Sequence, residues 1–140
     1  MILKLWLCFI IFSFASIASS QTLAELFQRT DNLYDFADYE KAIVFSEKAL
    51  KMAESDYGKK SNLYATALDK RARLYAIFGE SYKAEAFYKQ SLEIIKDNSG
   101  DKNNDYASVL LDLARLYSSI LRNREIIFTG AGLRKSSLRC

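Results

Sequence analysis

Side chains able to carry out catalysis are scarce in this sequence of 140 residues. It contains no histidine, which removes the most common general base and metal ligand. Its two cysteines, Cys8 and Cys140, lie near the ends of the chain, and no glycine-rich phosphate loop is present. Carboxylates such as Asp69 and Asp112 remain, and they are most simply explained as surface residues. We therefore expect a protein that is not an enzyme and that uses no cofactor and no metal.

The first 20 residues, MILKLWLCFIIFSFASIASS, have the composition of a secretory signal peptide. Lys4 supplies the positive start, an apolar stretch follows over 5–14, and Ala-Ser-Ser at 18–20 forms a small-residue cleavage site. The apolar stretch is shorter than the roughly 20 residues that a membrane-spanning helix needs. We predict cleavage after Ser20, export to the periplasm or the exterior, and no membrane association afterwards. An uncleaved anchor is the alternative.

The net charge of +3 is unevenly distributed along the chain. Residues 21–121 carry 14 lysines and arginines against 16 acidic residues, with both signs interspersed, whereas 122–140 carry five bases and one acid. A nearly neutral body lacks the basic surface that nucleic-acid binding requires, so we expect no nucleic-acid partner. After signal cleavage only Cys140 would remain, which excludes an internal disulfide and leaves open a disulfide between two chains.

The rest of the sequence predicts helices. It has no proline and only five glycines, so it lacks the residues that β-rich folds need at their turns. Apolar residues recur at spacings of three, four and seven, Asp38 can cap one helix, and Gly58 and Gly79 can end two others. Short turns make antiparallel neighbours the default packing. The expected helices cover about 23–34, 39–52, 63–77, 84–95 and 106–121, with polar breaks at 56–60 and 98–104.

The sequence repeats itself at a constant offset, which is the step from Tyr64 to Tyr106. The segment YATALDKRARLY begins at Tyr64, and the similar segment YASVLLDLARLY begins at Tyr106. Small residues recur at the same offset, Ala72 with Ala114, and allow helices to approach closely. A helix pair of this kind cannot bury its apolar face alone, so the next pair must cover it. The sequence therefore predicts an array of helix pairs.

The segment YEKAIVFSEKALKM at 39–52 resembles the second helix of a tetratricopeptide repeat. The stretch 65–94 resembles the longer, 42-residue variant found in kinesin light chains and in many bacterial repeat proteins. The resemblance implies an all-α fold, a short right-handed α-solenoid of antiparallel helix pairs. Arg29 and Arg71 depart from the family pattern, which usually has an inward leucine there, and Leu113 restores it. The module at 21–121 would then comprise repeat 1 at about 22–60, repeat 2 at about 64–104 and the first helix of repeat 3 at about 105–121.

The same resemblance implies a protein or peptide partner, bound in a concave groove that the first helix of each repeat lines. Arg73 and Arg115 are separated by the same repeat offset, so successive repeats would place them on one line. Their guanidinium groups could bind carboxylates of an extended peptide. Asp69 and Asp112 lie nearby, so the same surface could instead be internally paired. The candidate binding residues are Phe27, Tyr34, Asp69, Lys70, Arg73, Asp112 and Arg115.

Residues 122–140 do not continue the repeat. A second repeat helix would need a small, a bulky and a small residue where the chain has Ile126, Gly130 and Leu133. We leave this basic tail without an assigned structure and expect either a truncated product or a change of reading frame near residue 122. Two functions stay open: an interaction scaffold, or the N-terminal sensory or regulatory fragment of a larger exported protein. The open ends of so short an array also predict self-association.

Overall fold

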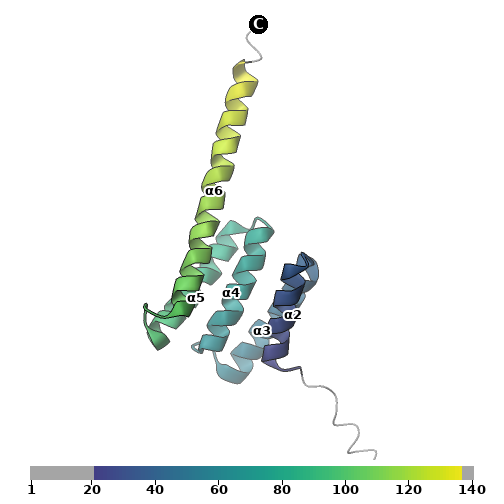
Figure 1. Ribbon diagram of the computed structural model, residues 1–140, viewed down its shortest axis with the longest axis vertical. Helices are drawn as coiled ribbons and strands as arrows, with labels where there is room; N and C mark the ends of the chain where they lie inside the picture. The colour runs from purple at the N-terminus through teal and green to yellow at the C-terminus, as the bar shows by residue number, and fades with distance from the viewer. Residues whose placement is uncertain (1–20, 137–140) are drawn as a thin grey trace, which may run out of the picture.

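The computed structural model describes residues 21–136, and within this range the chain forms five helices and no strand. The helices follow one another side by side, and α6 extends well beyond the others (Figure 1). None of the helices in this range is long and apolar enough to cross a membrane. The predicted all-α fold is confirmed, whereas the predicted signal peptide lies outside the described residues. The helices are α2 (Leu23–Asp35), α3 (Tyr39–Tyr57), α4 (Asn62–Ile77), α5 (Ser81–Ser99) and α6 (Asn104–Ser136).

Side-chain caps fix where three of these helices begin. At the start of α2, the Thr22 hydroxyl accepts from the Glu25 backbone N–H at 3.3 Å, and the Glu25 carboxylate accepts from the Thr22 N–H at 3.1 Å. The predicted cap of α3 is present, since the Asp38 carboxylate accepts from the Lys41 N–H at 3.3 Å. Ser61 caps α4 in the same way. These caps satisfy backbone donors that the first helical turn leaves unpaired.

The array is curved, with the first helix of each pair on its inner side. Each helix packs against the next one, and α4 also approaches α2 and α6. No corresponding approach joins α3 to α5 in the described part of the chain. Helices on the concave side of a curved stack lie closer together than those on the convex side. We call the surface formed by α2, α4 and α6 the inner face.

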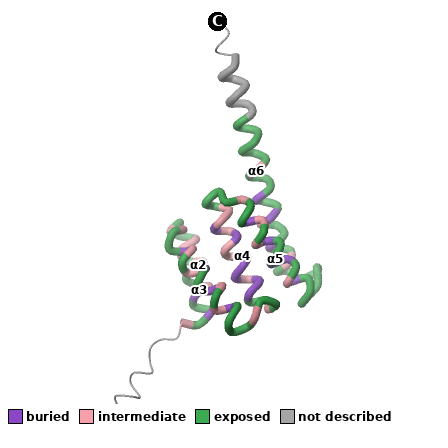
Figure 2. The backbone as a smooth tube through the Cα atoms, turned by 180° about the vertical axis from the view of Figure 1, so that it is seen from behind, coloured by how far each residue is buried: buried purple, intermediate pink, exposed green. Residues whose placement is uncertain are grey.

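The core consists of two clusters that share α4. Both clusters contain alanine at close helix contacts, and Figure 2 shows buried residues running along α4. Because α4 contributes to both clusters, it completes the first helix pair and starts the second. The first cluster contains Leu23, Leu26, Ala49, Ala53, Tyr64, Ala67 and Leu68. The second contains Ala65, Ala72, Ala84, Tyr88, Leu92, Ile95, Val109, Leu113 and Leu116.

Small residues bring the helices together as the repeat pattern predicted. Ala42, Ala72 and Ala84 are all fully buried. The Ser91 hydroxyl of α5 donates to the Ala65 carbonyl of α4 at 2.8 Å, which requires the two backbones to lie very close. A larger side chain at any of these positions would separate the helices and open voids between them.

Helix α6 differs from the predicted fifth helix. The repeat pattern ended that helix at Leu121 and assigned no structure to the tail, but α6 continues to Ser136. Over 122–129 nothing local stops it, because this stretch contains neither proline nor glycine and includes good helix formers such as arginine and glutamate; Gly130 and Gly132, which are poor helix formers, lie further along within α6. The prediction was wrong because it compared the tail with the repeat pattern and did not weigh its local helix propensity.

Two glycines, one in each repeat, end the second helix of each pair. Helices α3 and α5 run slightly into the predicted breaks and stop at Gly58, with φ of 83° and ψ of 160°, and at Gly100, with φ of 79° and ψ of 170°. This combination of positive φ and extended ψ is open almost exclusively to glycine. The repeat therefore fixes a backbone conformation as well as a helix spacing.

We expect Gly58→Ala to lower the free energy of unfolding by about 1–3 kcal/mol. An added Cβ would meet no atom within 4 Å, so the loss would come from the backbone alone. The control is Gly79→Ala, because Ala37 already holds a φ of 58° at the equivalent position of the first repeat. That control should cost about 1 kcal/mol or less. Urea unfolding followed by circular dichroism measures both, and equal losses would contradict the argument.

Candidate functional site

The inner face brings together all seven candidate binding residues. The three helices that form this face supply them, and contacts between helices connect most of them. Helix α2 contributes Phe27 and Tyr34; α4 contributes Asp69, Lys70 and Arg73; α6 contributes Asp112 and Arg115.

Lys70 joins α4 to α2. Its Nζ lies 2.6 Å and 2.7 Å from the two carboxylate oxygens of Asp31 and 5.4 Å from the centre of the Phe27 ring. The Lys70 side chain is only 14% exposed and Asp31 is 45% exposed, so the pair is shielded from water on the lysine side. Lys70 and Phe27 thus hold the first two inner helices together, and both are already engaged.

Arg73 occupies the middle of the face. Its guanidinium lies 4.4 Å from the centre of the Tyr34 ring on α2, a cation–π contact. Its Nε lies 3.9 Å from Oδ2 of Asp112 on α6. Arg73 therefore connects all three inner helices, and its charge is largely balanced from within the protein.

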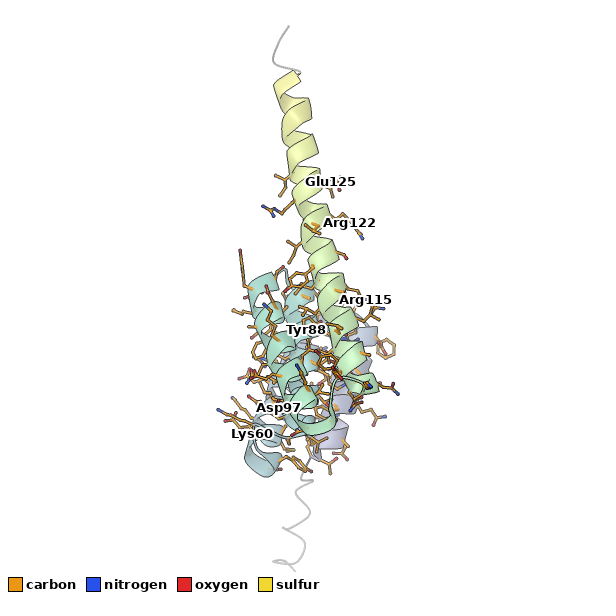
Figure 3. All side chains as sticks on the ribbon, turned by 90° about the vertical axis from the view of Figure 1, so that its left-hand side faces the viewer. Lys60, Tyr88, Asp97, Arg115, Arg122 and Glu125 are labelled. Carbon is orange, nitrogen blue, oxygen red and sulfur yellow. The ribbon has the colours of Figure 1, made fainter. Side chains whose placement is uncertain are left out.

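Asp112 is shared by two arginines. Besides Arg73, it accepts a hydrogen bond from Nη1 of Arg115 at 3.0 Å, one turn further along α6. Asp112 is 17% exposed, whereas Arg115 is 70% exposed. The sequence left open whether these charges face a ligand or pair internally. The structure pairs Asp112 internally and leaves Arg115 as the most accessible of the candidate cations; Figure 3 labels it on the stretch of α6 that lies alongside the other helices.

Asp69 is the most buried carboxylate of this network, near the charges of Arg73 and Lys70. Its Oδ1 is buried and makes no hydrogen bond in the described part of the protein. Burial, reinforced by the nearby charge of Asp112, raises the pKa of Asp69 to about 6. Tyr88 of α5 belongs to the same group, since burial and then the charges of Asp112 and Asp69 raise the pKa of its hydroxyl.

The sequence pattern placed Tyr88 only among the residues that fill gaps between helices. It is 2% exposed, so core packing is part of its role. The one signal in the sequence was that Ser46 stands at the equivalent position of the first repeat. An aromatic hydroxyl in place of a small serine indicates a feature specific to the second repeat, where the aspartates and Arg73 gather.

Arg71, the departure from the family's leucine, lies away from this network. Its guanidinium lies 5.3 Å from the centre of the Tyr75 ring, with Nη2 3.1 Å from the Tyr75 hydroxyl and 3.7 Å from a carboxylate oxygen of Glu47 on α3. Its side chain is 13% exposed, while Leu113 at the next repeat is buried outright. Arg29 makes a similar contact, 5.5 Å from the centre of the Phe45 ring. Both arginines pack against aromatic rings where a leucine would pack in the core.

The inner face is a connected network of charged and aromatic side chains from α2, α4 and α6. Between residues 21 and 136, no group of three or more side chains is placed to hold a metal ion. Lys70 and Arg73 are held by aromatic rings and by carboxylates, whereas Arg115 is held only by Asp112 and is 70% exposed.

Paired antiparallel helices that share an inner face define an α-solenoid repeat protein. The family model for the tetratricopeptide repeat matches residues 16–97, which is more than half of the chain. The chain belongs to the tetratricopeptide repeat family. Repeats of this family generally mediate protein–protein interactions and are typically non-enzymatic scaffolds.

Among solved structures, the chain is similar to the crystal structure of BtubC (BKLC) from P. vanneervenii. The TM-score is 0.66 and the identity 24%, over 75% of this chain and 43% of that chain. At this identity the likeness shows the fold, and this chain spans less than half the length of that protein. No curated protein matches the chain.

Proposed function

We propose that the chain binds an extended segment of another protein along its inner face, with an acidic side chain of that segment against Arg115. The observation that carries the proposal is the difference in exposure between the cations of the inner face. Lys70 is enclosed by Asp31 and Phe27, whereas Arg115 is 70% exposed on the same face.

The surroundings of Arg115 favour a carboxylate with an apolar neighbour. Its ionic partner, Asp112, also faces Arg73, so Arg115 can turn toward a ligand while Asp112 keeps one cation. Exchanging a partly exposed ion pair for another costs little. Leu111 lies one turn before Arg115 and is 52% exposed, which provides apolar contact area.

The test is selection of peptides from a random library displayed on phage, with the full chain as bait. We expect enriched peptides to share an acidic residue next to an apolar one, and Arg115→Glu to weaken their binding by about 10-fold or more. The control is Lys51→Glu on α3, a 76% exposed lysine that also has a carboxylate partner, Glu47 at 3.0 Å. That variant should bind as the parent does. Enrichment of nothing, or binding that survives Arg115→Glu, would contradict the proposal.

We also propose that the chain is exported and that residues 1–20 are removed. Support comes from the charged start, the apolar stretch and the small-residue site in the sequence. N-terminal sequencing of the protein recovered outside the cytoplasm should begin at Gln21. A protein that retains Met1 in that fraction would favour the uncleaved anchor.

A second candidate function is the N-terminal sensory or regulatory part of a larger exported protein. It is supported by an apolar side of α6 that the other described helices leave largely open, with Leu110 48% and Leu121 63% exposed. Translation of the downstream DNA in all three frames tests this candidate. A continued repeat pattern would favour it over the scaffold, and its absence would favour the scaffold.

A further inference from the structure

One side of α6 carries an apolar stripe that the other described helices leave largely open. The stripe consists of Ala107, Leu110, Ala114, Tyr117 and Leu121, at alternating spacings of three and four in the sequence. Leu110 is 48% exposed, Tyr117 40% and Leu121 63%. This is the heptad spacing with which one helix packs along another. Large side chains so arranged are costly to leave in water.

The same positions of the preceding repeat show what such a stripe packs against. Ala65, Leu68 and Ala72 of α4 precede the stripe by one repeat offset, and each is 0% exposed. Helix α5 packs along this side of α4, since Ser91 donates to the Ala65 carbonyl and Tyr75 stacks on Phe87 with ring centres 5.4 Å apart, while Leu68 also packs in the first cluster with α2 and α3. The stripe on α6 is therefore the surface on which an antiparallel helix lies in the previous repeat.

The space beside the stripe is open. A groove of about 640 Å³ lies between the start of α5 and α6, lined by Tyr82, Lys83, Tyr117 and Ile120 among others. Tyr82 is 91% exposed at its edge. The Tyr117 hydroxyl donates to the Glu85 carboxylate at 2.8 Å, which holds the ring in place on the groove wall.

The stripe is complementary to a second copy of itself in the reverse direction. Around a point between residues 115 and 116, Leu110 is the mirror position of Leu121, and Ala114 that of Tyr117. Two antiparallel α6 helices would thus pack leucine on leucine at both ends and tyrosine on alanine in the middle. A two-fold axis at this point makes the contact self-complementary, as a closed dimer requires.

Charge favours the same arrangement. The chain carries three aspartates and one lysine over 101–112, but five bases and one acid from Arg122 onward. Arg122 lies on the part of α6 that extends past the other helices (Figure 3). Arg124 continues the spacing of the stripe and is the mirror position of Ala107, so antiparallel pairing places it toward the acidic start of the partner's α6, whereas in-register parallel pairing would place it beside the partner's own Arg124. Parallel pairing would place like charges side by side.

We propose that the chain forms a two-fold symmetric dimer in which the α6 stripes of two copies pack antiparallel. Each α6 then takes, on its partner, the place that α5 takes on α4. The proposal is independent of the inner-face function, because it uses another side of α6.

The test is analytical ultracentrifugation of the full chain of 16.0 kDa per copy. We expect a dimer, and Leu110→Glu with Leu121→Glu should raise its dissociation constant at least about 30-fold while leaving the helical circular dichroism unchanged. The matched control is Val44→Glu on α3, a 51% exposed apolar residue outside the stripe. A parent chain that is monomeric at every concentration, or a dimer that Val44→Glu disrupts equally, overturns the proposal.

Disulfide trapping tests the orientation. In a chain with Cys8→Ser and Cys140→Ser, a mixture of Leu110→Cys and Leu121→Cys copies should cross-link across the pair on mild oxidation. Each variant alone should not, because antiparallel pairing separates identical positions by about 11 residues of helix, roughly 16 Å. Cross-linking of each variant with itself but not across the mixture would show parallel pairing and overturn the proposed dimer.

Discussion

Leu68→Ala is expected to lower the free energy of unfolding by about 2–5 kcal/mol. Leu68 is 0% exposed and lies where α2, α3 and α4 meet, in the cluster that includes Leu26 and Ala49. Truncation removes buried methyl groups and leaves a cavity that closely packed helices cannot fill by relaxing. Urea unfolding followed by far-UV circular dichroism gives the loss as a shift of the midpoint at constant slope.

The repeat supplies a matched control in Leu110→Ala. Leu110 holds the same position in the next repeat but is 48% exposed. Residue type and place in the helix are equal, so the difference measures burial. We expect a loss of about 1 kcal/mol or less from Leu110→Ala. Dilute protein keeps the proposed dimer from contributing, and equal losses would contradict the assignment of the core.

Because of the position of α4, we expect Leu68→Ala to destabilise the whole array and not one helix pair alone. In a linear array each helix pair contacts only its neighbours, so damage at one end can unfold that end alone. Helix α4 belongs to both core clusters, which leaves neither pair complete without it. We therefore expect one cooperative transition in the variant, moved to lower urea, and no separate early phase.

The repeat offset was enough to predict the array, because residues required for close helix packing and residues required for a particular backbone conformation both recur at this offset. Ala72 and Ala114 mark close helix contacts in the sequence, and Ala72 is fully buried. Gly58 and Gly100 repeat at the same offset because both must hold a conformation that other residues avoid. Local constraints of this kind recur with the repeat, so one sequence is sufficient to show them.

The partners of the charged residues could not be predicted in the same way. The repeat spacing predicted that Arg73 and Arg115 lie on one face. It did not predict that both arginines pair with Asp112. Long side chains choose partners by rotamer and by the offset between helices, and neither is visible in spacing. The length of α6 was missed for a different reason, since 122–129 contains no residue that ends a helix, and the helix continues there although the sequence no longer follows the repeat.

The buried carboxylate of Asp69 lowers the stability of the fold at neutral pH, and Asp69→Asn measures by how much. Burial raises the pKa of Asp69 to about 6 from an ordinary 3.8, so the folded protein holds this proton more tightly than the unfolded chain does. The Asp69 contribution to stability is therefore fully present below pH 4 and is lost as the pH rises toward 6. At pH 7 we expect the neutral amide to raise the free energy of unfolding by about 1–3 kcal/mol, and this gain should vanish near pH 4.

Urea unfolding of both proteins at pH 4, 5, 6 and 7 follows the gain, with Asp97→Asn, at an exposed position on α5, as the control. A gain that is the same at every pH would mean that the amide helps by packing, and that the charge of Asp69 costs nothing. A gain that grows between pH 4 and 6 shows a carboxylate kept on the inner face at the expense of stability. Proteins commonly tolerate a loss of stability at residues that a binding surface needs. Asp69→Asn should then give a more stable protein whose selected peptides bind differently from those of the parent.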